Sequence, residues 1–331
     1  MSFDATLPVI FMVLLGIAML VYVALDGYDL GVGMLMPFAS GEQKDTLVAS
    51  IGPFWDANET WLVLGVGLLL IAFPRAQGIV LGALYLPVAL MLLGLILRGV
   101  AFDFRVKAHD DHRAAWNLVF ASGSLIASVA QGWMLGRYVT GLQDTLASDL
   151  FAALIALALP GAYILLGATW LILKTEGALQ SRAIGWARRA WPAFVAGFGL
   201  ISIATPIASA TVRDRWFSLP EFFALAPIPL MSALALAAIR SLLNSHRIRG
   251  RLCWMPFALM LLVLLLGFFG LAYSLFPYIV VDQLTIWQAA SSPATLKIIL
   301  AGAAVAVPAI GAYTALAYRI FRGKASELSY A

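Results

Sequence analysis

Long uncharged segments alternate with short charged segments along the whole chain. Segments free of Asp, Glu, Lys, Arg and His run over residues 5–25, 60–74, 76–97, 114–136, 150–173, 190–212, 222–239, 252–281 and 298–318. Most of them have the roughly 20 residues that an α-helix needs to cross about 30 Å of hydrocarbon. The pattern therefore predicts an all-α polytopic membrane protein with about nine transmembrane helices.

The spacing of these segments predicts a single integral membrane domain over residues 1–331. We expect helices 1–4 to cover about residues 5–139 and helices 5–9 about residues 150–321. Two four-helix bundles plus one peripheral helix fit this division. The intervening loops are too short to hold a soluble domain.

The second uncharged segment is shorter than a membrane is thick. The 15 residues from Thr60 to Pro74 would reach only about 22 Å at about 1.5 Å per residue. A spanning helix must therefore begin earlier, passing Glu59 and Asp56 towards Pro53, a residue type that suits the first helical position. Length alone places Asp56 and Glu59 at the edge of the membrane.

Composition narrows the possible chemistry. Hydrophobic residues make up 62% of the chain and charged residues only 11%. The single cysteine, Cys253, excludes a disulfide framework and any cysteine-based zinc or iron–sulfur site. Neither a phosphate-binding loop nor an HExxH zinc motif is present. The apolar run from Leu7 follows no basic stretch and is too long for a signal peptide, so we interpret it as the first span.

Basic residues are distributed unequally between the two sides of the predicted membrane. Counting the loops alternately, one side holds five of the 21 basic residues, namely Arg75, Arg137, Arg213, Arg215 and Lys297, and the other side holds sixteen. Cytoplasmic loops of membrane proteins are enriched in Lys and Arg. We therefore expect a periplasmic N-terminus and a cytoplasmic C-terminus. The same bias explains the net charge of +4 without a nucleic-acid partner.

Four acidic residues form two pairs at the edges of apolar segments. Asp26 and Asp29 lie in LDGYDLGVGM, and Asp56 and Glu59 lie in GPFWDANETW. Residues three apart share one face of a helix. An ionisable group at membrane depth costs about 2.5–3.5 kcal/mol on insertion scales and usually marks an ion or proton route. The predicted orientation brings both pairs and Arg98 to the cytoplasmic side, where one arginine cannot neutralise four acids.

A simpler interpretation of the same residues remains open. The acids can be ordinary charges at helix ends, with Arg98 extending its head group to the interface and Trp55 and Trp61 in the aromatic belt. Against it, the acids lie in glycine-rich and aromatic sequence rather than in a polar loop. We therefore expect at least one carboxylate to carry or exchange a proton.

Other polar and small residues inside the predicted spans indicate helix packing. We expect Gln131, Tyr163 and Thr169 to form interhelical hydrogen bonds, and Gly27 and Gly31 to allow close packing as a GxxxG pair. The three histidines, which are His109, His112 and His246, all fall in the basic loops. No span thus offers the histidine pair that a six-coordinate membrane haem usually needs.

Three strings carry a resemblance to a known family. LDGYDLGVGML at 25–35, GPFWDANETWLV at 52–63 and RGVAFDFR at 98–105 together resemble subunit II of the cytochrome bd-type quinol oxidases, including their cyanide-insensitive branch. GSLIASVAQGWMLG at 123–136 supports the likeness. The resemblance is specific over the first three helices, and beyond them it rests on length, number of spans and orientation.

The resemblance implies a function for the complex rather than for this chain alone. Such oxidases oxidise quinol and reduce O2 to water, take the protons from the cytoplasm, and lie in the bacterial cytoplasmic (inner) membrane. It implies a heterodimer in which subunit I ligates haem b together with haem d or an additional haem b. A bound quinone and a small single-helix accessory subunit are further candidates, besides membrane lipids. No metal site of this chain's own is expected.

The resemblance also assigns candidate site residues. Asp26 and Asp29 match the paired acids of the family's first helix, Trp55 and Asp56 match the Trp-Asp of its second, and Arg98 matches the arginine of the third string. The family's pattern implies that Trp55, Arg98 and Asp29 lie near the haem propionates of the partner subunit.

The acids are the candidate proton carriers. We expect Asp56, Glu59, Asp26 and Asp29 to form a proton relay, with Asp56 as its leading member. Glu59 stands where some relatives have an amide, which adds a possible proton carrier to the family's pattern.

Two other functions are compatible with the same residues. A proton-coupled secondary transporter would also hold acids within its membrane region, although such proteins usually bind at the midplane between repeated halves. A purely scaffolding subunit would carry the acids for assembly alone. A haem-bearing partner that co-purifies favours the oxidase, and substrate uptake by the chain alone in liposomes favours the transporter.

Overall fold

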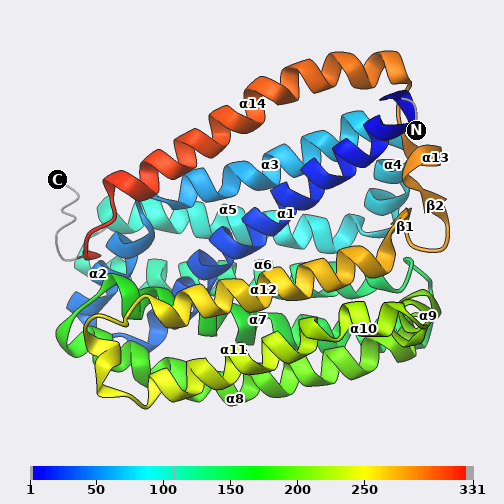
Figure 1. Cartoon of the computed structure of the whole chain (residues 1–331). Helices are drawn as coiled ribbons and strands as arrows, with labels where there is room; N and C mark the ends of the chain where they lie inside the picture. Colours follow the sequence, from blue (N-terminus) through cyan, green and yellow to red (C-terminus); the bar gives the residue numbers. More distant parts are fainter. Residues whose placement is uncertain (1–2, 108, 326–331) are drawn as a thin grey trace.

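The computed structural model describes residues 3–107 and 109–325 and is helical almost throughout (Figure 1). Among these residues, nine segments are long and apolar enough to cross a membrane. They are α1 (Phe3–Leu35), α3 (Trp55–Ala72), α5 (Tyr85–Lys107), α6 (Asp110–Val139), α7 (Leu146–Lys174), α8 (Gly177–Ala208), α10 with α11 (Glu221–Leu225 and Pro227–Leu243), α12 (Met255–Leu275) and α14 (Pro293–Ile320). The predicted fold class and the number of spans are confirmed.

Short elements connect the spans. They are η1 (Met36–Phe38), α2 (Gly41–Ile51), α4 (Pro74–Ala83), α9 (Ala210–Phe217), η2 (His246–Arg249), α13 (Ile286–Ala289) and the strands β1 (Tyr278–Val280) and β2 (Leu284–Thr285). The two strands pair as an antiparallel hairpin. In Figure 1 the hairpin and α13 lie at the end of the molecule that holds the N-terminus, whereas α2 lies at the opposite end, with the C-terminus. Consecutive spans run in opposite directions, so every second loop reaches the same end.

The long helices pack side by side, with α1 and α7 in the interior and α14 and α8 at opposite edges (Figure 1). The closest approach joins α1 to α7. A Cβ atom added to Gly31 would lie 1.8 Å from the backbone oxygen of Tyr163, and one added to Gly167 would lie 2.5 Å from the nitrogen of Val32. Larger residues would separate the two helices. The close packing predicted from Gly27 and Gly31 is confirmed, since Gly27 faces the Tyr163 ring in the same contact.

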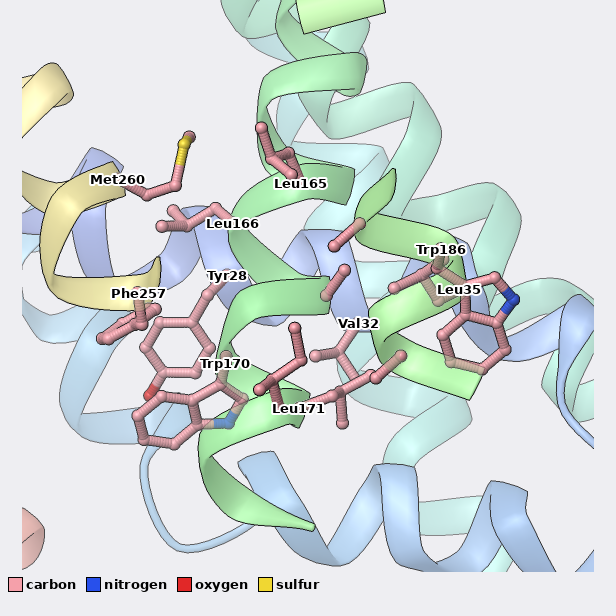
Figure 2. Packing of buried hydrophobic residues seen from close by; sticks show 14 of the residues in the cluster. Tyr28, Val32, Leu35, Leu165, Leu166, Trp170, Leu171, Trp186, Phe257 and Met260 are labelled. Atoms are coloured by element: carbon pink, nitrogen blue, oxygen red, sulfur yellow. The ribbon is translucent and has the colours of Figure 1, made fainter. Parts of the chain in front are cut away.

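An aromatic cluster fills the space between α1, α7 and α12 (Figure 2). The ring of Tyr28 stacks on Trp170 with centroids 4.2 Å apart, and Phe257 meets Tyr28 edge-on at 5.7 Å. Because lipid tails are as apolar as these side chains, helices in a bilayer associate through such packing and through hydrogen bonds rather than through the hydrophobic effect. The cluster sets the rotation of α1 about its axis, and with it the direction of the acids beside Tyr28.

The first two spans differ in detail from the segments read in the sequence. Helix α1 continues ten residues past the end of its uncharged segment, so Asp26 and Asp29 lie inside it and are fully buried. Helix α3 begins at Trp55 and includes Asp56 and Glu59, as its short uncharged segment predicted. The expectation for Pro53 was wrong, since it lies in the turn before the helix.

The third span differs from its uncharged segment as well, because a break divides that segment. The uncharged segment 76–97 was expected to form one helix, but it is divided at Leu84 between α4 and α5. Pro87 lies in the first turn of α5, where its missing N–H removes no intrahelical hydrogen bond. A helix that continued through this point would lose a backbone hydrogen bond at Pro87, which favours a new start.

Candidate functional site: a buried cluster of acids around Arg98

Arg98 on α5 joins two acids from two other helices. Its side chain is 2% exposed, and one guanidinium nitrogen lies 2.6 Å from Oδ1 of Asp26 on α1. The other terminal nitrogen donates a hydrogen bond to Glu59 on α3. Three spans that are distant in sequence therefore meet at one cation. Asp26 is as buried as Arg98, whereas the side chain of Glu59 is 29% exposed.

The local charges do not balance. Asp29 is fully buried on α1 close to this pair of acids, so three carboxylates surround one guanidinium. With all of them ionised, this buried group would carry two uncompensated negative charges. A carboxylate without a cationic partner is unfavourable in a low-dielectric environment, so it tends to bind a proton instead of staying charged. The arrangement can therefore hold at least one exchangeable proton.

Several polar atoms in the cluster lack a hydrogen-bond partner among the described residues. They are Oδ2 of Asp26, Oδ1 of Asp29 and Nε of Arg98. A buried polar atom without a partner is uncommon in a native protein and usually indicates a water, a proton or a ligand. Asp26 and Arg98 thus retain hydrogen-bonding capacity that their mutual contact does not use.

Asp29 forms no hydrogen bond with Arg98 in the described structure and instead contacts Asn58 of α3. The amide Nδ2 of Asn58 donates to Oδ2 of Asp29 at 2.8 Å and to the hydroxyl of Tyr28 at 2.9 Å. The hydroxyl of Tyr318, on α14, donates to Oδ1 of Asn58 at 3.1 Å and lies 2.5 Å from the Tyr28 hydroxyl. The last span of the chain therefore contributes a polar group to this part of the site.

A second group of hydrogen bonds lies deeper along α1. Gln131 of α6 donates to the hydroxyl of Tyr22 at 2.8 Å and accepts from the hydroxyl of Tyr163 on α7 at 2.7 Å. The interhelical hydrogen bonds predicted for Gln131 and Tyr163 are confirmed. The prediction for Thr169 was wrong, because its hydroxyl donates to the Leu166 carbonyl on its own helix.

Asp56 and Trp55 lie at the outer side of the cluster. Asp56 is exposed and lies one helical turn before Glu59, outside the hydrogen bonds around Arg98. The half-buried ring of Trp55 packs against Phe102 with centroids 5.2 Å apart. Trp55, Arg98 and Phe102 line a narrow crevice together with Ile51 and Phe120. The crevice is too small to hold a water molecule, and the guanidinium beside it is almost fully covered.

A second buried arginine closes the end of the site. Arg105, about two turns after Arg98 on α5, donates to Asp45 of α2 and to Asn117 of α6, both at 2.6 Å. These bonds tie α2 across the ends of α5 and α6. Helix α2 was not expected from the sequence, although Ser40 and Gln43 form a capping box at its start.

The structure therefore separates the sequence-derived candidates into three places. Asp26 and Glu59 bind Arg98, Asp29 binds Asn58, and Asp56 is exposed with Trp55 nearby. The sequence reasoning missed the uncharged partners, which are Tyr22, Tyr28, Asn58 and Tyr318. Asn58 had a detectable signal, since it is an amide between Asp56 and Glu59 on a membrane helix. Tyr318 had none, because it lies 260 residues from Asn58.

The histidines stay away from this cluster. His109 lies just before α6, His112 lies in the first turn of α6, and His246 lies in η2, all three exposed. In the part of the chain that the structure describes, no three His, Cys, Asp or Glu side chains gather as a metal site would require.

Comparisons with known proteins agree with one another. Residues 7–321 match the family described as cytochrome bd terminal oxidase subunit II. The chain is 29% identical to cytochrome bd ubiquinol oxidase subunit 2 of Bacillus subtilis, over 98% of both chains. It is 26% identical to cytochrome bd-I ubiquinol oxidase subunit 2 of Escherichia coli K12, over 93% of this chain and 92% of the relative.

A solved structure has the same fold. A chain in the structure of the bd oxidase from Geobacillus thermodenitrificans superposes with a TM-score of 0.75 and 19% sequence identity, over 96% of this chain and 100% of that one. At this level of identity the similarity concerns the arrangement of the helices.

Proposed function

The chain belongs to the cytochrome bd terminal oxidase subunit II family, and we propose that it is the haem-free subunit that supplies protons and supports a haem in a quinol:O2 oxidoreductase. The family is part of an oxidoreductase complex, and the nine candidate spans agree with a multi-pass protein of the bacterial inner membrane. The observation that carries the proposal is the buried Arg98, shared by two acids and lying beside the rings of Trp55 and Phe102.

The chemistry of the residues around Arg98 suits the acidic edge of a haem held by subunit I. A haem propionate is an anion on an apolar macrocycle, and it needs a cationic donor beside apolar or aromatic surface. Arg98 offers an Nε without a partner in the described chain, and the rings of Trp55 and Phe102 flank it. Bound there, the haem would supply the electron-transfer chemistry. This chain's own residues would hold the propionate and exclude water around it.

The acids suit a proton route with graded exposure. Asp56 is exposed, Glu59 is partly exposed one turn further along α3, and Asp26 is buried. A proton that enters at Asp56 can pass to Glu59, which already binds Arg98. Asp26, with its short contact to the guanidinium, is the permanent counter-ion in this proposal. Asp29 is the second proton carrier, since its contact is a neutral amide.

The same route requires the acids to face the cytoplasm. The alternating direction of the spans brings the sixteen basic residues and the start of α3 to the end of the molecule that holds the C-terminus (Figure 1). The excess of basic residues at that end supports a cytoplasmic C-terminus and a periplasmic N-terminus.

The decisive experiment replaces Asp56 by Asn in the complete oxidase. Asp56→Asn should reduce quinol oxidase turnover about tenfold or more, since positioned acid–base groups contribute about 10²–10⁴-fold, while the haem spectrum stays intact. Asp103→Asn is the matched control, because Asp103 is also an exposed acid near that end of the spans. Normal turnover in Asp56→Asn would remove Asp56 from the route. Loss of assembly with unchanged activity of the surviving complex would favour a scaffolding role.

A further inference from the structure

Three side chains from three helices form a closed ring of hydrogen bonds around Asn58. Nδ2 of Asn58 on α3 donates to the hydroxyl of Tyr28 on α1, the hydroxyls of Tyr28 and Tyr318 are in contact, and Tyr318 on α14 donates to Oδ1 of Asn58. Since the hydrogen of Tyr318 is used on Asn58, Tyr28 must be the donor in the contact between the hydroxyls. Every hydroxyl in the ring therefore donates once and accepts once, and the ring has a direction.

That direction matches an ionised Asp29. With the amide in this orientation, the second hydrogen of Nδ2 points at Oδ2 of Asp29, 2.8 Å away. The same nitrogen lies 3.5 Å from the Leu25 carbonyl, a longer contact. A carboxylate accepts hydrogen bonds only, so it requires the NH2 end of the amide on its side.

A protonated Asp29 requires the opposite direction. The carboxyl group then donates from Oδ2 and needs an acceptor, which Asn58 provides if its amide turns over, because its O and N ends have nearly the same shape. The turned amide accepts from Asp29 and Tyr28 and donates to Tyr318, and Tyr318 donates to Tyr28. The nitrogen and oxygen of the Asn58 amide exchange positions, while the other heavy atoms keep theirs, each hydroxyl keeps its own hydrogen, and the contacts of the ring are made again.

We propose that Asn58, Tyr28 and Tyr318 are positioning residues whose hydrogen-bond ring reverses its direction each time Asp29 binds or releases a proton. This inference rests on the proton-carrying role proposed above for Asp29. The ring gives Asp29 a hydrogen-bond partner inside the protein in both of its protonation states. It also makes the last span part of the site, since α14 carries Tyr318.

The burial of Asp29 and of its partner Asn58 supports this role. Asp29 and Asn58 are fully buried, and Asn58 is the hydrogen-bond partner of Asp29 among the described residues. The other charged groups that face Asp29 are Asp26 on its own helix, Glu59 on α3 and Arg98 on α5. None of them forms a hydrogen bond with Asp29 in the described structure. The amide is therefore the group that must respond when the carboxyl group changes its protonation.

Towards the same end of the bundle, α7 contributes Lys174. Its Nζ lies over the rings of Phe54 and Trp170 and donates to the carbonyl oxygens of Phe321 and Gly323, just after α14. Lys174 therefore holds the end of α14 near the ring.

The test is infrared difference spectroscopy of the complete oxidase during a pH titration. We expect a carboxylic-acid C=O band that Asp29→Asn removes, and a tyrosine band that Tyr318→Phe removes, with the same titration midpoint. The tyrosine band should also disappear in Asp29→Asn, because the ring no longer reverses. Tyr318→Phe should slow quinol oxidase turnover about threefold to tenfold, which is the change in rate that corresponds to the net free energy of one hydrogen bond.

Thr314→Val is the matched control. Thr314 accepts a hydrogen bond from Trp61 of α3 at 3.1 Å, one turn before Tyr318 on the same face of α14, and takes no part in the ring. The Thr314→Val variant should weaken the packing of α14 on α3 without changing either infrared band. Three results would each contradict the proposed reversal of the ring. They are different midpoints for the two bands, a tyrosine band that persists in Asp29→Asn, and the absence of any band that depends on Asp29.

The two proposals fail separately. Normal turnover in Asp29→Asn, with both bands still coupled in the native oxidase, would remove Asp29 from the proton route and leave the ring intact. Reduced turnover in Asp29→Asn, with no tyrosine band in the native spectrum, would support Asp29 as a member of the proton route. The same result would contradict the reversing ring. Equal turnover losses in Thr314→Val and Tyr318→Phe would assign Tyr318 to helix docking alone.

Discussion

Two arginines in this chain are each shared by two acids, yet their surroundings differ. Arg98 in α5 binds Asp26 and Glu59, and Arg137 in the last turn of α6 binds Asp144 and Asp149. Both guanidinium groups are largely buried. The acids of Arg137 are 98% and 45% exposed, whereas those of Arg98 are 1% and 29% exposed.

The difference shows what makes an acid–arginine contact a candidate site. Water solvates the acids of Arg137, so their charges do not need the arginine as a partner. Asp26 has no such alternative, because it is buried and Arg98 is its ion-pair partner. The acids around Arg98 therefore depend on their arginine more than those around Arg137 do. Three experiments test this contrast, in order of expected effect.

Replacing each arginine by alanine should give the largest difference. Arg98→Ala leaves Asp26 buried without its cation, a change that costs about 3–5 kcal/mol in a buried pair. Arg137→Ala should cost about 1 kcal/mol, since its acids can turn to water. Thermal midpoints and haem spectra of the purified complexes measure both effects. We also expect Arg98→Ala to perturb the haem spectrum, and similar losses in the two variants would contradict the contrast.

Neutralising one acid in each cluster should separate function from stability. Glu59→Gln keeps the shape and a hydrogen bond to Arg98 but cannot carry the proton, so turnover should fall about tenfold or more. Asp149→Asn makes the same kind of change beside Arg137 and should leave turnover within about twofold. Quinol-driven O2 consumption measures both. Equal activity of the two variants would assign Glu59 a structural role.

Salt should give the smallest effect. The Debye length falls from about 10 Å at 0.1 M to about 3 Å at 1 M salt, and exposed charges are screened more strongly than buried ones. The difference in thermal midpoint between Arg137→Ala and the native complex should therefore shrink at 1 M NaCl. The difference caused by Arg98→Ala should persist. A loss of both differences at high salt would mean that water reaches the Arg98 cluster.

The spans could be predicted because hydrophobic length is a property of the sequence. Uncharged segments located all nine candidate helices in the described chain, and the shortness of one of them placed Asp56 and Glu59 inside α3. The same criterion ended the first helix too early, because Asp26 and Asp29 interrupt the uncharged run. A carboxylate can lie inside a span when it has a polar partner there, and these two have Arg98 and Asn58.

The sequence by itself determined that this chain is a membrane protein with more acids than cations near one side of three spans. These properties depend on composition and on spacing along the chain. Only the tertiary structure decided that Asp26, rather than Asp29, binds Arg98, and that Tyr318 from the last span completes the surroundings of Asp29. The physical reason is that the rotation of each helix about its axis, which selects partners, depends on contacts such as Gly31 against Gly167 and Tyr28 against Trp170. Those contacts join residues that are far apart in the sequence, so a local sequence pattern cannot predict them.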